Sequence, residues 1–436
     1  MLKRKIESDL IQWKNRRHKQ ALLVEGARQV GKTTSIRSFA KQHYESFIEL
    51  NFERNPKLKD IFMDDLEPKT IYMNMSAMGL GPMKPGKTLI FFDEIQSCPQ
   101  ARTAIKFLVE DGRYDFIESG SLLGINYKDV SSYPVGFEEH IRMYSLDFEE
   151  FMWANHISED VIQELKQCFK DQCPIPAFIH DKMMKLYYQY LIVGGMPNVV
   201  NEFIETYDIN EVIRIQKDII ASYRDNISKY AEGKKAKVKE IFEAIPEQLN
   251  KKNQRFYFSS LTAEPALRSY EGAITWLNDA GIASMCCNVT QPQLPLSFNQ
   301  KRNLFKLFIC DSGFLTAMSY GRIQPNILKG ELTINNGAVV ENDVAAGILK
   351  KGFDIYYYDC KKPLQMEIDF LIQYQGGILP IKVKSGDDYK KHPSLDRFMS
   401  QYADMDQAIV FCKGNIEKDG KLLYLPLYMT GFLENE

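Results

Sequence analysis

At 436 residues the chain is too long for one ordinary hydrophobic core, and a usual domain size of about 100–200 residues predicts roughly two to four domains. Hydrophobic residues make up 44% of the chain and charged residues 26%, which is typical of a folded globular protein. The net charge of −2 excludes a global attraction to a polyanion, so any nucleic-acid contact would need a local basic patch.

The sequence gives no sign of membrane insertion or export. No apolar run approaches the length of a membrane span, and residues 1–20 carry charges of both signs without an apolar segment. The eight cysteines are scattered without a CxxC pair, so zinc-ligand spacing is absent and reduced, mostly buried thiols are expected. These features predict a cytoplasmic protein with no membrane partner.

The first strong motif follows a predicted strand near residue 21. The segment QALLVEGARQVGKTT matches GxxxxGK[ST], with an apolar run before the loop and a helix start after it. In such a loop, backbone N–H groups face phosphate oxygens, the lysine bridges the terminal phosphates and the hydroxyl ligates magnesium. The predicted nucleotide-binding residues are Gly26, Ala27, Arg28, Gln29, Val30, Gly31, Lys32, Thr33 and Thr34, with Lys32 also catalytic and Thr33 a metal ligand.

A second motif supplies the other half of such a site. TLIFFDEIQ, at residues 88–96, reads as a buried strand that ends in two carboxylates, as a Walker B element does. We expect Asp93 to hold Mg²⁺ and Glu94 to activate the attacking water as a general base. Two motifs in this order, each at a strand end, favour an ATP site over a chance glycine loop.

Two further strands complete the predicted first domain. FIELNF, at residues 47–52, is expected to be a parallel neighbour, and YDFIESGSLLG, at residues 114–124, ends in small polar residues. In ring-type and related ATPases, a polar residue on a strand between the two Walker strands senses the γ-phosphate. Ser119 is the candidate for this catalytic role, with Ser121 close behind, and an ordinary strand-end turn is the alternative. Residues 1–150 are therefore predicted to form a P-loop AAA-like ATPase domain with a parallel α/β sheet.

The middle of the chain reads as helical over residues 151–230 and as winged-helix-like over residues 231–325. Residues 268–282 take the recognition-helix position, but their polar set holds two acids and a single base, which disfavours DNA readout. GGMP, at residues 194–197, is expected to be a helix corner. Four lysines, Lys234, Lys235, Lys237 and Lys239, are interpreted as a solvated helix start, with a phosphate-backbone contact as the alternative.

The last predicted domain, residues 326–436, has the helix, hairpin and strand expected of a PD-(D/E)xK nuclease core. In an active core, three acids bind one or two metal ions and a lysine positions the attacking water. Glu341, Asp369 and Lys384 match three of these positions, but Lys382 stands where the third acid belongs. An ammonium group there repels a divalent cation. We therefore expect a degenerate nuclease-like site, with Glu367 as the acid that could rescue a single-metal site.

The chain resembles a large prokaryotic family of predicted AAA-superfamily P-loop ATPases that carry a C-terminal domain of unknown function. The resemblance covers nearly the whole chain and lies in LLVEGARQVGKTT, LIFFDEIQ, FIESGSLLG, SLDFEEFMWA and YLIVGGMPNVV. It implies ATP binding, a helical and winged-helix middle and a C-terminal restriction-endonuclease-like fold. Many relatives carry an arginine after the glycine that corresponds to Gly136, where this chain has Phe137.

Three functions remain open from sequence. The first is a Mg²⁺-dependent ATPase that couples nucleotide state to its C-terminal modules, which Glu94 favours because a pure binder does not need it. The second is an ATP-bound switch or scaffold that recruits DNA or a protein partner, which Phe137 favours. The third, an ATP-gated nuclease, is disfavoured by Lys382. Arg102, Arg113 and Arg142 are candidates for an arginine that stabilises transition-state charge, none is assigned, and assembly into an oligomer is left open.

Overall fold

The computed structural model describes residues 2–121, 134–231, 233–251, 253–258, 267–320, 337–361 and 365–435. The chain divides into two compact units. The first comprises Lys3–Tyr144 together with Asp279–Gly281, and the second comprises Ser145–Asn278 and Ile282–Glu436.

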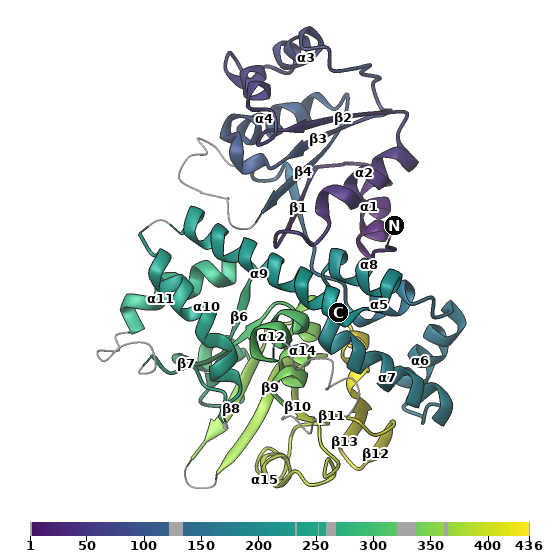
Figure 1. Cartoon of the computed structure of the whole chain (residues 1–436), viewed down its shortest axis with the longest axis vertical. Helices are drawn as coiled ribbons and strands as arrows, with labels where there is room; N and C mark the ends of the chain where they lie inside the picture. Colours follow the sequence, from purple (N-terminus) through teal and green to yellow (C-terminus); the bar gives the residue numbers. More distant parts are fainter. Residues whose placement is uncertain are drawn as a thin grey trace. The chain divides into compact units, whose positions relative to one another are not determined.

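The first unit is built on a sheet of five parallel strands in the order β2-β3-β4-β1-β5 (Figure 1). The strands are β1 (Ala21–Gly26), β2 (Ser46–Asn51), β3 (Thr88–Asp93), β4 (Asp115–Ser121) and β5 (Glu138–Arg142). The predicted parallel α/β arrangement is confirmed, while β5 was not predicted. All six residues of β3 are buried, as expected for a strand that is covered on both faces of its sheet.

Helices cover both faces of this sheet. The helical segments are α1 (Ile6–Lys14), α2 (Lys32–His43), η1 (Pro56–Phe62), α3 (Pro68–Ala77), η2 (Ile95–Ser97) and α4 (Pro99–Asp111). One face packs against η1, α3 and α4 in a core rich in aliphatic and phenylalanine side chains, and α2 packs against β1, β2 and β4. The parallel connections bring the carboxyl ends of β1, β3 and β4 to one edge, where the predicted site residues lie.

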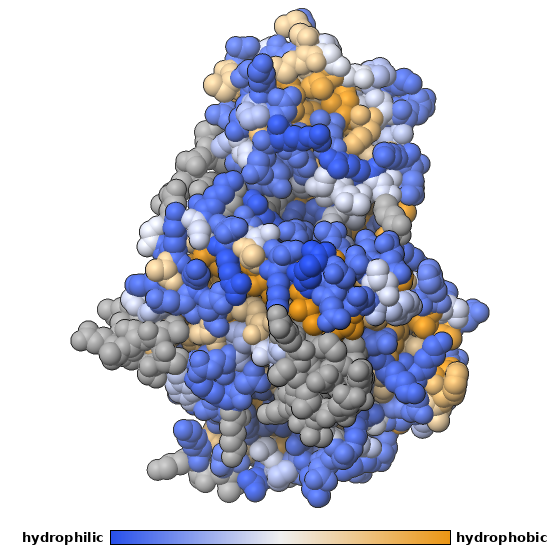
Figure 2. Space-filling model, in the orientation of Figure 1, coloured by the Kyte–Doolittle hydropathy of each residue, from blue (hydrophilic) through white to orange (hydrophobic). Residues whose placement is uncertain are grey.

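Exposed apolar side chains of the first unit include Met63 (64% exposed), Met73 (61%) and Met78 (42%), around η1 and α3. Figure 2 shows hydrophobic residues gathered on the surface around α3. None of these methionines belongs to the predicted site. Within the described part of the chain, no helix is long and apolar enough to cross a membrane.

The helices of the second unit are α5 (Phe148–Ala154), α6 (Glu159–Asp171), α7 (Ala177–Val193), α8 (Pro197–Thr206), α9 (Ile209–Tyr230), α10 (Lys235–Leu249), α11 (Leu267–Asp279), α12 (Ser312–Tyr320), α14 (Gly337–Lys350) and α15 (Pro393–Gln401), with 3₁₀ turns η5 (Leu296–Asn299) and η7 (Leu427–Phe432). The GGMP segment, residues 194–197, forms the corner between α7 and α8, as predicted. A Cβ atom on Gly194 would lie 2.1 Å from Asp311 Oδ1, and one on Gly195 would lie 2.0 Å from Leu146 O. Both glycines are therefore explained by close packing.

An eight-stranded mixed sheet runs through the second unit in the order β12-β13-β11-β10-β9-β8-β6-β7. Its strands are β6 (Ala283–Val289), β7 (Gln300–Ile309), β8 (Tyr356–Cys360), β9 (Met366–Tyr374), β10 (Gly377–Lys384), β11 (Ala408–Cys412), β12 (Glu417–Asp419) and β13 (Leu422–Pro426). The β6–β7 hairpin lies within the segment predicted to be winged-helix-like, and it joins the C-terminal strands because β6 pairs with β8. The sheet thus runs across the domain boundary expected near residue 325.

Candidate functional site

The loop between β1 and α2 closes tightly around its own lysine. Gly31 has φ 98°, a left-handed conformation that favours glycine. A Cβ atom on Gly26 would lie 2.2 Å from the backbone oxygen of Met143, so a side chain there would displace the loop. The Lys32 ammonium donates hydrogen bonds of 2.9 Å to the carbonyl oxygens of Gly26 and Ala27. The glycines and Lys32 thus stand where the P-loop motif requires them.

Asp93, the last residue of β3, is the centre of a polar network at the carboxyl edge of the sheet. Thr33 Oγ1 donates to Asp93 Oδ1 at 3.1 Å, and Asn51 Nδ2 donates to Asp93 Oδ2 at 2.7 Å. Ser119 Oγ also donates to Asp93 Oδ1. Three strands and the start of α2 therefore meet at one buried carboxylate, and Ser119 binds that carboxylate directly.

Glu94 follows Asp93 in a left-handed backbone conformation, with φ 56° and ψ 50°. A non-glycine residue in this region costs about 1–3 kcal/mol, and such residues cluster at functional sites. Its carboxylate accepts a hydrogen bond from Gln96 Nε2, which fixes its direction. The carboxylates of Glu94 and Asp93 therefore have different hydrogen-bond partners, although the two residues are adjacent in the chain.

The environment of Lys32 shifts the pKa of its ammonium group. Burial lowers the pKa of Lys32 to about 8, and Glu94 and Asp93 offset only part of that effect. A buried ammonium group is one that phosphate oxygens would stabilise. Glu94 and Asp93 thus compensate the buried charge of Lys32 only in part.

This lowered pKa gives a pH-dependent stability. The unfolded lysine titrates near 10.5 and the folded one near 8, so the unfolded state binds more protons between these values. The penalty for burying Lys32 is complete below pH 8 and fades as pH rises to 10.5, with a span of about 3 kcal/mol. Nucleotide-free wild type should therefore gain stability relative to Lys32→Met over this range in urea titrations. Parallel pH profiles for the two proteins would contradict the assignment.

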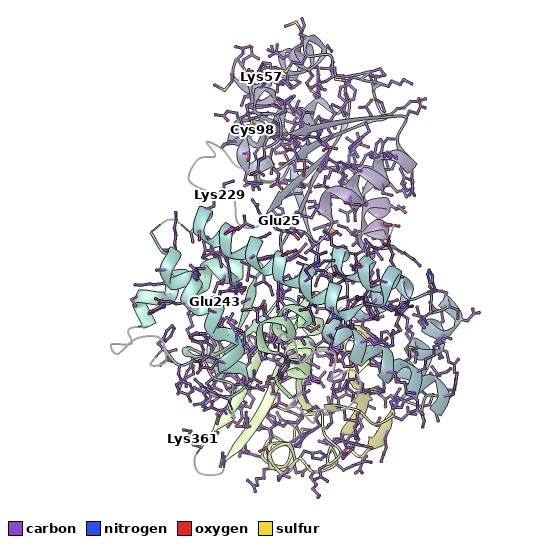
Figure 3. All side chains as sticks on the ribbon, viewed as in Figure 1. Glu25, Lys57, Cys98, Lys229, Glu243 and Lys361 are labelled. Atoms are coloured by element: carbon purple, nitrogen blue, oxygen red, sulfur yellow. The ribbon has the colours of Figure 1, made fainter. Side chains whose placement is uncertain are left out.

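A charged cluster lies on the opposite face of the sheet. The Arg102 guanidinium bonds Glu138 at 2.9 Å, and His140 lies 3.1 Å from Glu138 and 3.5 Å from Glu25, the residue labelled at the end of β1 in Figure 3. Burial, and then the charge of Glu138, raise the pKa of the adjacent Glu118 well above its usual range. Arg102 is therefore an internal counter-ion of this cluster and is not presented to a neighbouring molecule.

The other candidate arginines also have local partners. Arg113 pairs with Asp111 at 2.8 Å and lies over the ring of Tyr72, while the Arg142 guanidinium lies 5.3 Å from the centroid of Tyr144. Neither lies in the Asp93 network. The first unit thus places no candidate arginine among the described contacts of the predicted nucleotide site.

Asn51 is a site residue that the sequence reasoning missed. It ends β2, beside β3, in register with Asp93. The signal was a polar residue at the end of FIELNF, the same pattern that singled out Asp93 and Ser119. On the same strand, Glu49 pairs with Arg37 of α2 at 2.6 Å and fixes the helix that begins with Lys32.

The predicted nuclease-like residues also come together, within the second unit. Lys382 Nζ lies 2.6 Å from Asp369 Oδ1, and Lys384 follows on the same strand. Glu341 of α14 does not face open space but pairs with Lys306 of β7 at 2.8 Å. Lys306 was not predicted, because nothing local marks a lysine in QKRNLFKLFI as an internal residue.

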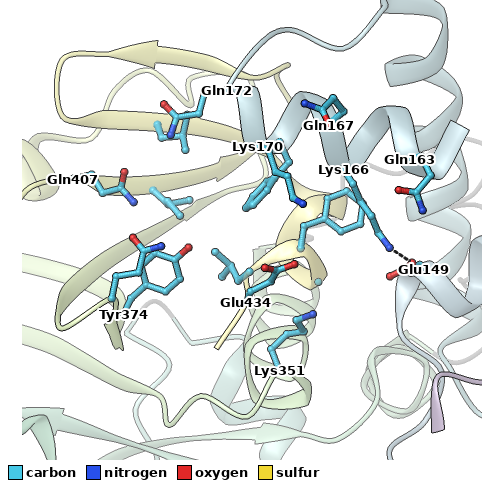
Figure 4. Close-up of a pocket in the computed structure, with 17 residues that line it drawn as sticks. Glu149, Gln163, Lys166, Gln167, Lys170, Gln172, Lys351, Tyr374, Gln407 and Glu434 are labelled. Carbon is cyan, nitrogen blue, oxygen red and sulfur yellow. Dashed lines mark hydrogen bonds and ion pairs between the residues drawn. The ribbon is translucent and has the colours of Figure 1, made fainter. Parts of the chain in front are cut away.

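A pocket of about 410 Å³ lies in the second unit. Figure 4 shows the side chains that line it. Three lysines, Lys166, Lys170 and Lys351, and several glutamines line it together with Glu149 and Glu434. Lys166 is paired with Glu149 at 2.6 Å. None of the predicted site residues lines this pocket, so it is separate from both candidate sites.

The fold and loop geometry define the first unit as a P-loop nucleotide-binding domain. Residues 18–152 match a family model described as "AAA domain", so the first unit is an AAA-type domain. Residues 184–324 and 336–428 match two further models, each described as a domain of unknown function, DUF8612 and DUF4143. A comparison with curated proteins found no match.

Among solved structures, the chain is similar to the ORC1 protein of Aeropyrum pernix in complex with DNA, with 12% identity, a TM-score of 0.29 and coverage of 75% of this chain and 92% of that one. It is also similar to the RuvB Holliday junction branch migration motor of Thermotoga maritima, with 13% identity, a TM-score of 0.30 and coverage of 65% and 89%. Similarity at this level carries no argument about function.

Proposed function

We propose that the first unit binds ATP with Mg²⁺ and hydrolyses it, and that nucleotide state is coupled to the second unit. The observation that carries this proposal is the network around Asp93, in which the P-loop hydroxyl of Thr33 and the Walker B carboxylate already touch. Oxygen ligands of this kind suit Mg²⁺. Thr33 and Asp93 would hold the ion, and its chemistry when bound is to neutralise charge on the phosphates.

Three side chains would carry out the remaining steps of ATP binding and hydrolysis. The Lys32 ammonium would leave the Gly26 and Ala27 carbonyls and bond the terminal phosphate oxygens. Glu94, directed by Gln96, would accept the proton of the attacking water. Ser119 would hold Asp93 in one orientation, which makes it a positioning residue in this scheme.

A slowly hydrolysing switch remains the second candidate. It is favoured by Phe137, and by the placement of Arg102, whose side chain is 4% exposed and bonded to Glu138. Without an arginine to stabilise transition-state charge, phosphoryl transfer is slower by about 10³–10⁵. In this alternative, ATP is held and the second unit recruits DNA or a protein.

For the second unit we propose a degenerate restriction-endonuclease-like fold preceded by a winged-helix-like segment. The order α14, β8, β9, β10, α15, β11, with β10 parallel to β11, supports the first part. The order α9, α10, α11 and the β6–β7 hairpin supports the second. In the basic cluster, Lys237 donates to Ser269 O at 2.9 Å, so at least one lysine has an internal partner. The client, an oligomeric state and a cytoplasmic location stay predictions.

Nucleotide binding is tested directly with Lys32→Ala. Removing the ammonium should weaken ATP binding about 100-fold, because charge-assisted bonds to phosphate contribute roughly 1.5–3 kcal/mol each. Lys41→Ala, an exposed lysine on the same helix, is the matched control and should bind normally. Calorimetry with Mg²⁺ and ATP measures both. Equal affinity for Lys32→Ala and wild type would reject the site.

A further inference from the structure

Four charged side chains are buried together in the second unit. Lys306 of β7 lies 2.8 Å from Glu341 of α14, and the side chains are 1% and 10% exposed. Lys382 of β10 lies 2.6 Å from Asp369 of β9, and these side chains are 14% and 5% exposed. Buried ions are tolerated only when each is paired, so these two pairs form a structural unit.

The two pairs act as one cluster. Burial lowers the pKa of both Lys306 and Lys382, but Glu341 and Asp369 act on both lysines and raise the pKa by more, so each net pKa lies above its usual value. Both lysines therefore stay protonated. Burial raises the pKa of Glu341, and Lys306 and Lys382 offset part of that rise. Because both acids act on both lysines, the four side chains form one cluster, called the quartet below.

Neighbouring groups use the hydrogen-bonding capacity that remains. The backbone N–H of Val383 donates to Asp369 Oδ2 at 2.7 Å. Lys306 Nζ also donates to Gln254 Oε1 at 3.2 Å, and Lys382 Nζ donates to the backbone oxygen of Glu367 at 3.4 Å. The quartet is thus enclosed by protein donors and acceptors.

The position of α14 is fixed independently of these charges. Asn342, next to Glu341, accepts from the backbone N–H of Ile309 at 2.8 Å and donates to its carbonyl oxygen at 3.1 Å. This pair of bonds ties α14 to β7, the strand that carries Lys306. Glu341 and Lys306 are therefore held together by the backbone of two elements.

The quartet has two acids and two ammonium groups, so its formal charge is zero. A divalent cation needs an excess of carboxylate oxygens, and like charges repel it. Among the described residues, no group of three or more His, Cys, Asp or Glu side chains could hold a metal ion. The ammonium groups of Lys306 and Lys382 are paired with Glu341 and Asp369, the two acids that the nuclease-like pattern assigns to metal binding.

We propose that Lys306 and Lys382 together replace the divalent cation of a PD-(D/E)xK-like site, so that the second unit folds without a metal and cleaves no DNA. The inference rests on the nuclease-like part of the proposed function, but not on ATP hydrolysis. Lys382 alone was suspected from the sequence. The structure adds Lys306, so reverting Lys382 leaves one internal cation in place.

The test is a Mn²⁺ titration of nucleotide-free full-length protein, followed by thermal unfolding. The variants are Lys382→Glu and the double variant Lys306→Met/Lys382→Glu, and Lys361→Glu is the control because it makes the same charge change at an exposed site. Wild type and the control should show no Mn²⁺-dependent shift. The double variant should gain about 3–5 °C at tenfold excess over its Kd.

A Mn²⁺ shift in the double variant but not in Lys382→Glu supports the proposal and assigns the remaining block to Lys306. A shift of equal size in both variants overturns the role of Lys306, because Lys382 alone would then exclude the metal. A folded double variant without any shift overturns the proposal. A variant can also fold only when Mn²⁺ is present, as judged by circular dichroism in EDTA and in Mn²⁺. That result is equivalent to a Mn²⁺-dependent rise in its unfolding temperature.

Measurements on the wild-type protein test the proposal even if the variants fail to fold. Dialysis against EDTA should leave its unfolding unchanged, and Mn²⁺ should produce no DNA cleavage. A Mn²⁺-dependent shift or cleavage that Asp369→Asn abolishes would overturn the proposal. Phosphate release from ATP, measured on the same samples, reports on the first unit separately, so failure of one proposal is distinguishable from failure of the other.

Discussion

Glu94→Gln should retain ATP and lose hydrolysis. The substitution keeps the size of the side chain and an oxygen that can accept from Gln96. It removes the carboxylate that we propose takes the proton of the attacking water. General-base catalysis contributes about 10²–10⁴ in rate, so phosphate release should fall at least about 100-fold. A phosphate-release assay measures the rate, and calorimetry should show an almost unchanged affinity for ATP.

The control for this experiment is Glu110→Gln, an exposed glutamate on α4 of the same unit, which should hydrolyse ATP at the wild-type rate. If wild type releases phosphate and Glu94→Gln releases it equally fast, Glu94 is not the base. If wild type binds ATP and releases no phosphate, the switch is the better description. The experiment therefore separates the two functions that the site supports.

Asp369→Ala should strongly destabilise the second unit. It leaves the Lys382 ammonium buried without its carboxylate, and breaking a buried pair in this way costs about 3–5 kcal/mol. The backbone N–H of Val383 also loses its acceptor. Scanning calorimetry should show a Tm lowered by roughly 10 °C for the transition that ATP does not shift.

Asp388→Ala is the matched control, because Asp388 is 82% exposed and its pairing with Lys391 is open to solvent. Its effect should stay within about 0.5 kcal/mol. If the two alanine variants unfold alike, the buried quartet does not stabilise the unit. Both substitutions remove the aspartate of a lysine–aspartate pair, so the difference between them measures the effect of burying the pair.

The sequence predicted the first unit well because its chemistry is local. A P-loop needs glycines and a lysine within one short segment, and Asp93 ends a strand whose apolar run is unmistakable. Asn51 and Ser119 could be placed beside Asp93 only through the strand order, which depends on pairing between distant segments. Strand β5 was missed because EEHIR lies at an edge and carries charged residues.

The second unit was harder to predict because its site is assembled from distant segments. Lys382 could be read as a substitution within a known spacing, but Lys306 lies on another strand and reaches Glu341 only through the packing of α14 on β7. The pairing of β6 with β8 also joins segments that are far apart in the chain. No local pattern encodes either contact.

The pairing of β6 with β8 has a consequence for how this protein could have evolved. Because Cys287 pairs with Tyr356 and Asn288 with Tyr357, the hairpin and the C-terminal strands complete one another's hydrogen bonding. Deleting either part would leave an open strand edge, which invites association with other chains. The two segments are therefore expected to be inherited together, as one unit of the sheet.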